Sequence, residues 1–314
     1  MLQQYNTSLR CRPIEETLKY ARAYAKKLGV SRVTNTTRLD RIGIPVYASI
    51  RPNAMDYSLC VNAGKGLQPK EAEVGAFMEA IELAMAEPNW ANLPIIQAKA
   101  REVLDGATRS DAIVDFCPVK GSKIGLDDKI DCVEAIDLYT QQKFLTPAVL
   151  AFFPYFDKNG WFTSSTNGLS SGNSLTEATI HGILEVIERD IHSFDQILNY
   201  SELIPPQTYP SGIKIIEQKV KDAGLELALR YVPNSFNIPY FKAAIIDHEL
   251  ANPVFIHGGY GCHLSKEIAA MRAATEAVQS RLSFIHGGRD DLTDAFKIYA
   301  HETEDDRAKR FKLL

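Results

Sequence analysis

Residues 172–188 read GNSLTEATIHGILEVIE, and residues 66–82 read GLQPKEAEVGAFMEAIE. Both segments place Glu-Ala at the same offset, with a second Glu eight residues after the first and a third Glu three residues later. Residues 263–279 read HLSKEIAAMRAATEAVQ, which keeps the second of these carboxylates as Glu276 and replaces the third with Gln279. One pattern in three ungapped segments indicates an internal repeat.

Each repeated segment has the apolar spacing of a helix. Ser174 and Glu177 form a capping-box pattern, Ser265 holds the matching position in the third segment, and Pro69 suits the first turn of the first. A helical projection at about 100° per residue predicts which apolar side chains face the core. These are Val74, Phe77, Met78 and Ile81 in the first segment, and Ile180, Ile183, Leu184, Ile187 and Ile191 in the second.

A stripe of acidic side chains lies beside each apolar face. The stripes contain Glu71, Glu79 and Glu82 in the first helix and Glu177, Glu185 and Glu188 in the second. Carboxylates three residues apart on one helix face repel each other by a few tenths of a kcal/mol when exposed, and by more when dry. Hard divalent cations prefer clustered carboxylate oxygens, and Mg²⁺ usually brings phosphate oxygens with it. Two matched stripes favour a cation site, whereas a single Glu pair is typical of a solvated helix face, and Glu177 alone could be only a cap.

The rest of the chain indicates mixed helix and sheet. A helix is predicted over 14–28, between Pro13 and Gly29. Strands are predicted over 41–50, 57–63, 148–153, 227–232, 240–246 and 253–258. No linker or low-complexity segment divides the sequence, so one compact α/β body is expected.

Composition excludes several classes of protein. The 314 residues are 45% hydrophobic and 24% charged, which indicates a globular chain rather than a disordered one. Thirty-five Lys+Arg against 39 Asp+Glu leave no basic surplus for nucleic acid. The apolar stretch 144–156 is short and contains two prolines, so no membrane span is expected. The N-terminus carries no secretory signal, which predicts a cytoplasmic protein.

Common catalytic and metal-binding motifs are missing from the sequence. The five cysteines form no CxxC pair, so reduced thiols are expected rather than disulfides or a zinc site. The patterns GxSxG, HExxH and GxGxxG do not occur. Gly64-Lys65-Gly66 before a helix is a weak signal for a phosphate cradle at a helix N-terminus.

Four stretches together resemble the signature of the YcaO family. They are TTRLDRIGIPVYASIRPN (36–53), GKGLQPKEAEVGAFMEAIE (64–82), SSTNGLSSGNSLTEATIHGILEVIERD (164–190) and RAATEAVQSRLSFIHGGRDD (272–291). Their order and spacing agree with the family, and the resemblance extends over most of the chain. It implies a single YcaO-like catalytic domain over 1–314, in which repeated helix–sheet units surround a nucleotide site.

The resemblance implies an enzyme that uses ATP and Mg²⁺ to modify backbone amides of a ribosomally made precursor peptide. In a cyclodehydratase, a Cys, Ser or Thr side chain attacks the preceding carbonyl, ATP phosphorylates the oxyanion, and loss of phosphate leaves an azoline, the precursor of a thiazole or oxazole. This reaction is the first expectation. Thioamide formation with a sulfide donor and a TfuA-like partner is the second, and a non-catalytic peptide-binding subunit is the third.

By position, the resemblance also assigns site residues. The Mg²⁺ ligands would be Glu79, Glu82, Glu177, Glu185 and Glu188, of which Glu79, Glu82, Glu185 and Glu188 are also the expected catalytic residues. The nucleotide contacts would be Arg10, Thr17, Ser170, Asn173, Arg189 and Gln279, with Glu276 nearby, and the Gly64-Lys65-Gly66 signal adds Lys65 as a further expected contact. Gly75 stands where several members have Ser, so no chemical role is expected for it.

The resemblance further implies partner proteins. A leader-peptide-binding protein, ubiquitin-activating-like or TfuA-like, is expected, together with a flavin dehydrogenase for azole products. The chain is expected to form a homodimer or to join a synthetase complex. It ends at Leu314 after a charged tail that is shorter than in typical members, so the C-terminal end is expected to be short or missing. No general base is evident.

Overall fold

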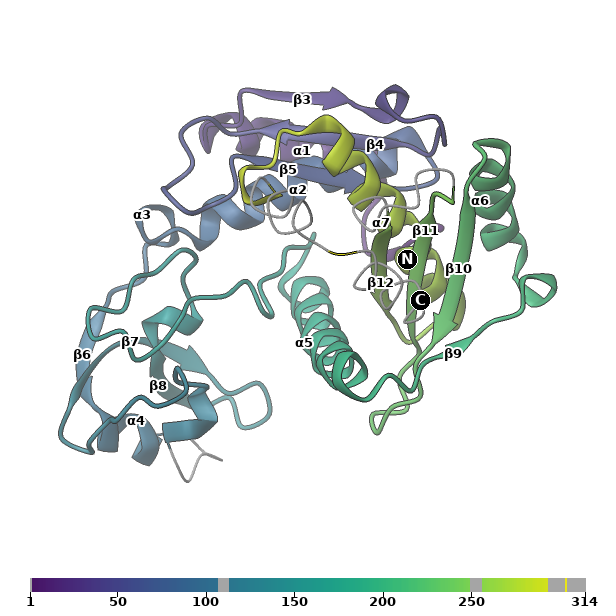
Figure 1. Ribbon diagram of the computed structural model, residues 1–314. Coiled ribbons are helices and arrows are strands. Elements are labelled where there is room, and N and C mark those ends of the chain that lie inside the picture. Colours follow the sequence, from purple (N-terminus) through teal and green to yellow (C-terminus); the bar gives the residue numbers. More distant parts are fainter. Residues whose placement is uncertain (1, 107–112, 249–255, 293–302, 304–314) are drawn as a thin grey trace. The chain divides into compact units, whose positions relative to one another are not determined.

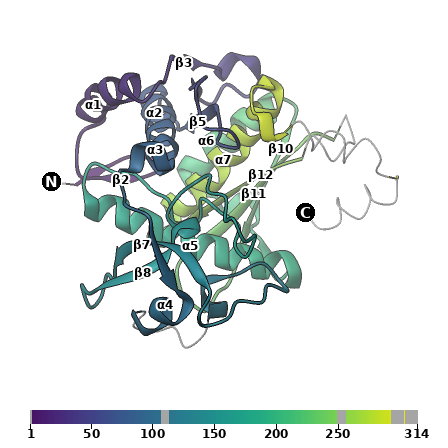
Figure 2. The ribbon, with the colours of Figure 1, turned by 90° about the vertical axis from the view of Figure 1, so that its left-hand side faces the viewer.

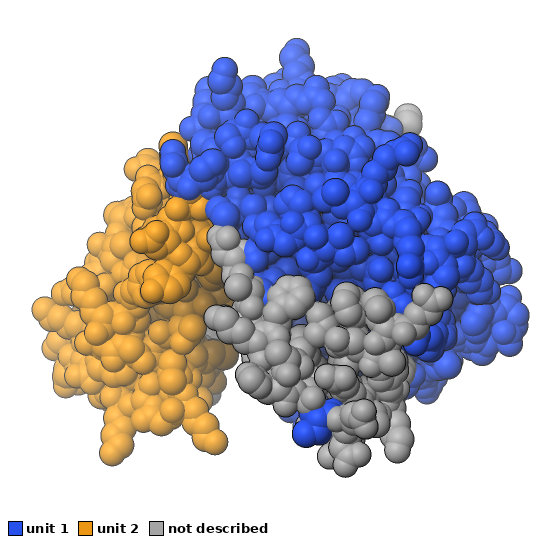
Figure 3. All heavy atoms as spheres, turned by 45° about the horizontal axis from the view of Figure 1, so that its top comes forward, with its two compact units in different colours: residues 1–53, 59–81, 170–314 blue, residues 54–58, 82–169 orange. Residues whose placement is uncertain are grey.

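The computed structural model describes residues 2–106, 113–248, 256–292 and 303, and it divides into two compact units (Figures 1 and 3). Unit 1 comprises residues 1–53, 59–81 and 170–314, and unit 2 comprises residues 54–58 and 82–169. Both units contain helices and antiparallel strands, which confirms the mixed fold class. A single catalytic domain over 1–314 stays a prediction, and the charged C-terminal tail lies outside the described residues.

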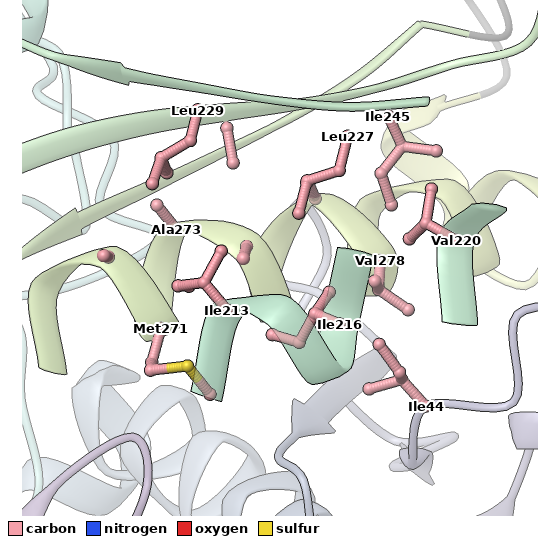
Figure 4. Packing of buried hydrophobic residues seen from close by; sticks show 14 of the residues in the cluster. Ile44, Ile213, Ile216, Val220, Leu227, Leu229, Ile245, Met271, Ala273 and Val278 are labelled. Atoms are coloured by element: carbon pink, nitrogen blue, oxygen red, sulfur yellow. The ribbon is translucent and has the colours of Figure 1, made fainter. Parts of the chain in front are cut away.

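A four-stranded antiparallel sheet forms the largest part of unit 1. Its order is β12-β11-β10-β9, with β9 at Glu202–Leu203, β10 at Glu226–Tyr231, β11 at Tyr240–Ile246 and β12 at His257–Cys262. Helices α6 (Ser211–Asp222) and α7 (Lys266–His286) pack against one face of this sheet. Figure 4 shows Ile213 and Ile216 of α6 in one buried cluster with Leu227 and Leu229 of β10 and with Ala273 and Val278 of α7.

A second sheet of unit 1 precedes helix α2. Strands β3 (Arg32–Asn35), β4 (Val46–Ile50) and β5 (Val61–Lys65) are antiparallel, and α2 (Pro69–Ala86) follows and crosses into unit 2 after Ile81. Helix α1 (Ile14–Lys27) lies beside α2 (Figures 1 and 2), where Ala25 and Val30 pack with Ala80. The short pair β1 (Gln3–Gln4) and β2 (Leu9–Arg10) precedes α1.

Helix α5 (Leu175–Leu198) packs on the face of the four-stranded sheet opposite to α6 and α7. Its Leu184 and Ile191 are buried with Val232, Tyr240 and Cys262. Tyr240 and Cys262 are opposite each other on β11 and β12. The face of the sheet that carries them is therefore the one that α5 covers.

Helix α7 is buried on nearly all sides, because it packs on β12, β11 and β10 and also shares a core with Ala63 of β5. The backbones of β12 and α7 are very close. A Cβ atom on Gly259 would lie 2.2 Å from the Ala277 nitrogen, and one on Gly261 would lie 2.1 Å from the Ala269 oxygen. Only glycine fits at these two strand positions.

The same close approach occurs between β5 and α2. A Cβ on Gly64 would lie 2.1 Å from both the Ala72 oxygen and the Ala76 nitrogen. Gly75 of α2 is part of this contact, since its own Cβ would lie 3.2 Å from the Gly64 Cα. The glycine at position 75 therefore has a packing role.

Unit 2 contains a three-stranded antiparallel sheet and short helices. Strands β6 (Ile96–Lys99), β7 (Lys129–Ile136) and β8 (Lys143–Pro147) are adjacent in that order. Helix α4 (Ala100–Gly106) follows β6, and α3 (Pro88–Ala91) precedes it. Val103, Phe116, Cys132 and Phe162 are buried together in its core.

Most predicted elements are confirmed, with four differences. Only 46–50 of the predicted strand 41–50 pairs in the sheet. The strand predicted over 57–63 is β5 at Val61–Lys65, because Tyr57 has a positive φ of 71° that interrupts extended backbone. The prediction over 148–153 is wrong, since the strand ends at Pro147 and a 3₁₀ turn follows over Ala148–Leu150. Of the strand predicted over 253–258, residues 253–255 lie outside the described residues, and the observed strand β12 is His257–Cys262.

The predicted apolar faces are only partly correct. In α2 the buried stripe is Ala72, Ala76 and Ala80, while Val74 and Met78 are half-buried. In α5, Leu184 and Ile191 are buried, but Ile180 and Ile183 are 49% and 45% exposed. Alanine lines the buried side of α2 because β5 approaches too closely for larger side chains.

None of the described helices combines the length and the apolar composition that crossing a membrane requires.

Replacing Gly259 with alanine should destabilise unit 1 by about 3 kcal/mol or more, because the new methyl group would overlap helix backbone that has no room to move. Gly258→Ala in the same strand is the matched control. Its Cβ would meet only the Tyr260 hydroxyl, at 3.3 Å, and that side chain can shift. Urea unfolding of both variants measures the difference, and equal stability of the two would contradict the close strand–helix contact.

Candidate active site

Lys65 at the end of β5 and Glu276 in α7 form an ion pair among the predicted nucleotide contacts. The Lys65 Nζ lies 2.6 Å from the Glu276 Oε2, and the amide of Tyr260 donates to the other oxygen of Glu276 at 3.3 Å. One turn further along α7, the Gln279 side chain donates to the carbonyl of Ala63 at 3.4 Å. Strands β5 and β12 and helix α7 therefore bring Lys65, Glu276 and Gln279 together.

Glu79 of α2 and Glu188 of α5 are electrostatically linked to this ion pair. Burial raises the pKa of Glu79 from 4.5 to about 7, although Lys65, Arg289 and the amide of Ala63 oppose the shift. Burial, followed by the charge of Glu276, also raises the pKa of Glu188, whose carboxylate accepts the amide of Cys262 at 2.8 Å. Two half-buried carboxyl groups thus lose their proton only with difficulty near neutral pH. A bound cation would stabilise their ionised forms.

Glu177 is held in a different environment at the start of α5. Its carboxylate accepts hydrogen bonds from Arg10 at 3.1 Å, from the amide of Cys11 at 2.9 Å and from the amide of Asn173 at 3.2 Å. Burial alone would raise the pKa of Glu177, but these partners outweigh it and lower the pKa to about 2. Ser174 accepts the amide of Glu177, so the predicted cap is confirmed, while Glu177 as a metal ligand stays a prediction.

Four predicted nucleotide contacts lie around Glu177. Besides Arg10 and Asn173, Thr17 of α1 donates to the Asn173 side chain at 2.7 Å. The hydroxyl of Ser170 donates to the Ala178 carbonyl at 2.7 Å. The short N-terminal segment and the loop before α5 thus form a second group of site residues.

The remaining predicted site residues are Glu82, Glu185 and Arg189. Glu185 and Arg189 form an ion pair within α5 at 3.4 Å. Glu82 belongs to unit 2. Among the residues that the structure describes, no three His, Cys, Asp or Glu side chains converge in a preformed metal site. The five-carboxylate Mg²⁺ site therefore stays a prediction.

Two arginines near the site were missed by the sequence analysis. Arg289 pairs with Asp291 at 2.6 Å, and its charge also lowers the pKa of Glu79. Arg272 lies four residues before Glu276 on α7, and its charge lowers the pKa of Glu188. The spacing of Arg272, Glu276 and Gln279, which places them on one helix face, was the signal that could have identified Arg272.

Comparison with known proteins gives one consistent family. A family model described as "YcaO cyclodehydratase, ATP-ad Mg2+-binding" matches residues 63–314. An uncharacterized protein from Methanothermobacter thermautotrophicus is 35% identical over 285 residues, with 89% of this chain and 72% of that protein covered. An uncharacterized protein from Rhizobium leguminosarum bv. trifolii, named for its place in the tfuA 3′ region, is 31% identical, with 88% and 68% covered.

A solved structure has the same fold. The chain is similar to YcaO from Methanopyrus kandleri bound with AMPPCP and Mg²⁺, with a TM-score of 0.70 and 26% identity. The match covers 90% of this chain and 70% of that one.

Glu79→Gln should change stability in a pH-dependent way. The pKa of Glu79 is about 7 in the native protein and 4.5 in the unfolded chain. Between pH 4.5 and pH 7, Glu79 is therefore protonated more often in the native protein than in the unfolded chain. The free energy of unfolding consequently falls as the pH rises through this range. Glutamine does not titrate, so the variant should be about 1–2 kcal/mol more stable than the wild type at pH 8, after allowance for partial exposure, and similar to it near pH 4.5. Urea unfolding at both pH values measures this.

The control for this measurement is Glu202→Gln, which removes an exposed carboxylate of β9. A Glu79→Gln variant that is destabilised equally at both pH values would contradict a penalty for ionising Glu79.

Proposed function

The chain belongs to the YcaO family, and we propose that it uses ATP and Mg²⁺ to phosphorylate the oxygen of peptide backbone amides. One observation carries the proposal: the carboxyl groups of Glu79 and Glu188, from two helices, have raised pKa values beside the Lys65–Glu276 ion pair. A bound cation would stabilise the ionised form of these carboxylates. Mg²⁺ in proteins is commonly coordinated by carboxylates together with phosphate oxygens of a substrate. The family model, described as binding ATP and Mg²⁺, agrees with this donor set.

The residues of the candidate site are chemically suited to bind both Mg²⁺ and ATP. Carboxylate oxygens are the donors that Mg²⁺ prefers, and we propose Glu79, Glu82, Glu177, Glu185 and Glu188 as its ligands. The proposed nucleotide contacts are Arg10, Thr17, Lys65, Ser170, Asn173, Arg189, Glu276 and Gln279. When bound, Mg–ATP supplies the phosphoryl group that converts the amide oxygen into a leaving group. The engagement of Glu177 with Arg10 supports a role in holding the N-terminal segment in addition to any metal contact.

The protein's own contribution is charge stabilisation rather than a nucleophile. Charge that shifts among phosphate oxygens is stabilised by fixed cations, a role that suits Lys65 and Arg10. Burial raises the pKa of the Cys262 thiol, which lies beside Glu188, to about 12. A thiol with this pKa stays protonated and is a weak nucleophile. The attacking group is therefore assigned to the substrate.

Cyclodehydration, which gives an azoline, is the first reaction we propose. In this reaction a Cys, Ser or Thr side chain of a ribosomally made precursor peptide attacks the preceding carbonyl, and the phosphorylated oxygen leaves as phosphate. The name of the family model favours this reaction. The reaction would require a leader-peptide-binding partner, and a flavin dehydrogenase where the azoline is oxidised further.

Thioamide formation is a second candidate. It uses the same activated amide oxygen, with an external sulfide as the nucleophile. The relative from Rhizobium leguminosarum bv. trifolii that is named for the tfuA 3′ region favours this candidate. The partner would then be TfuA-like.

Mass spectrometry of a co-expressed precursor peptide distinguishes the two products. Loss of water is expected for an azoline, and replacement of one oxygen by sulfur is expected for a thioamide. Co-expression with the Glu185→Gln variant is the control, because a proposed Mg²⁺ ligand is removed. An unmodified peptide with a chain that still binds Mg–ATP would contradict both reactions and favour a non-catalytic peptide-binding subunit.

ATP and Mg²⁺ together should stabilise the protein more than either alone, because the cation offsets repulsion between the carboxylates and the phosphates. A ligand at a concentration one hundred times its dissociation constant raises the free energy of unfolding by about 2.7 kcal/mol. A thermal melt resolves a change of this size. Glu79→Gln and Glu185→Gln should remain folded and lose both this joint shift and Mg-dependent ATP consumption, whereas Glu202→Gln should keep both. Equal shifts with ATP in the presence and absence of Mg²⁺ would contradict the proposed site, and NADH should give none.

A further inference from the structure

Strand β12 lies at one end of the four-stranded sheet, and two of its amides bind carboxylates of the candidate site. The amide of Tyr260 donates to Glu276 of α7 at 3.3 Å, and the amide of Cys262 donates to Glu188 of α5 at 2.8 Å. Both carboxylates are therefore held by the backbone of one strand. The position of β12 between the two helices thus determines how far apart Glu188 and Glu276 lie.

Few side chains are available to hold β12 in place, because three of its six residues are glycines. On the face toward α7, Gly259 and Gly261 allow the close backbone contact described above. The face toward α5 carries Gly258, Tyr260 and Cys262, of which Tyr260 has by far the largest side chain. Contact with the Tyr260 ring is therefore the main way in which α5 can fix the position of this strand.

His192 of α5 makes this contact. The centroids of the His192 and Tyr260 rings are 4.1 Å apart, and the two ring planes meet at 52°. The imidazole is itself fixed, because its Nδ1 lies 3.2 Å from the hydroxyl oxygen of the fully buried Tyr240. Tyr240 is on β11, directly opposite Cys262 of β12. His192 therefore joins α5 to both strands.

A buried ion pair stabilises the same region of α5. Asp195, three residues after His192, accepts a hydrogen bond from the Lys242 Nζ at 2.6 Å, and the Asp195 side chain is fully buried. Lys242 is on β11, directly opposite Tyr260. Burial, followed by the charge of Lys242, lowers the pKa of His192 below its usual value. The imidazole is therefore neutral near pH 7, and its contact with Tyr260 brings no second positive charge close to Lys242.

We propose that His192 is a positioning residue of the candidate site, an inference that rests on the proposed function. His192 lies one helical turn after Glu188, so one helix carries both the carboxylate and the ring that holds β12. By holding Tyr260, His192 fixes the two amides that bind Glu188 and Glu276. These carboxylates repel each other, since the charge of Glu276 acts on Glu188. Their spacing matters for the proposed cation, because Mg²⁺ demands near-ideal ligand geometry.

Hydrogen exchange of single amides in the full chain without ligand tests the positioning directly. His192→Ala should speed exchange at Tyr260 and Cys262 by about tenfold or more, because their acceptors are no longer held in place. His192→Phe combined with Tyr240→Phe keeps a ring against Tyr260 and leaves no buried hydroxyl unpaired, so exchange should stay close to that of the wild type. This double variant also supplies the comparison if the alanine variant does not fold.

Calorimetric titration of the full chain with AMPPCP and Mg²⁺ tests the consequence for binding. His192→Ala should weaken binding by about tenfold at a temperature where every variant is folded, and the double phenylalanine variant should recover most of the affinity. Ile213→Val is the matched control, because it removes a methylene group from the core on the other face of the sheet. It should lower the melting temperature and leave both the affinity and the exchange of the two amides unchanged.

The proposed function can fail separately from this inference. If the wild type does not bind AMPPCP with Mg²⁺, the proposed function fails, and amide exchange still tests whether His192 holds the two carboxylates. Unchanged exchange at Tyr260 and Cys262 in His192→Ala would overturn the inference whatever the nucleotide result. Faster exchange with unchanged affinity for AMPPCP and Mg²⁺ would also overturn it, because His192 would then support only the fold.

Discussion

The close approach of the β12 backbone to the α7 backbone is the constraint on which the structure of unit 1 depends. Gly259 and Gly261 bring the strand so close that a Cβ atom at either position would overlap the backbone of α7 at Ala269, Ala273 or Ala277. Most polar groups on a helix that is buried on nearly all sides have hydrogen-bond partners. The polar side chains of α7 that remain, among them Glu276 and Gln279, accordingly contact β5 and β12. The contact between β12 and α7 thus determines both the packing of unit 1 and the positions of Glu276 and Gln279 in the candidate site.

The carboxylates of the candidate site fall into two electrostatic classes. Glu177 is satisfied by a cation and backbone amides, so its charge is stabilised within the protein itself. Glu79 and Glu188 have too few such partners to offset their burial. The acidic stripes therefore contain carboxylates that differ in what they require: Glu177 supports the fold, and Glu79 and Glu188 are proposed ligands of an external cation. The spacing of the glutamates alone does not reveal this division.

Helix positions and the helix cap were well predicted from the sequence, and features that depend on a second element, including which helix face is buried, were not. The helix over 14–28 and the cap at Ser174 follow from local residues, and both are present. The alanine stripe of α2 was missed because alanine is a weak signal of burial until the neighbouring strand is known to carry Gly64. Strand β12 was placed too early because its glycines are unusual in strands, and they are needed only for the approach to α7. The spacing of Arg272 on α7 was visible in the sequence, but its electrostatic effect on Glu188 depends on a second helix.

The hydrogen bond between Arg10 and Glu177 joins residues that are 167 positions apart, and the contact between Thr17 and Asn173 spans 156. A chain is synthesised from its N-terminus, so these contacts cannot form until the first turns of α5 have left the ribosome. More than half of the protein must be made before Arg10 and Thr17 acquire these two partners, whereas the amide of Asn6 can bind Glu71 earlier. These contacts therefore form late relative to the synthesis of the segment that contains Arg10 and Thr17.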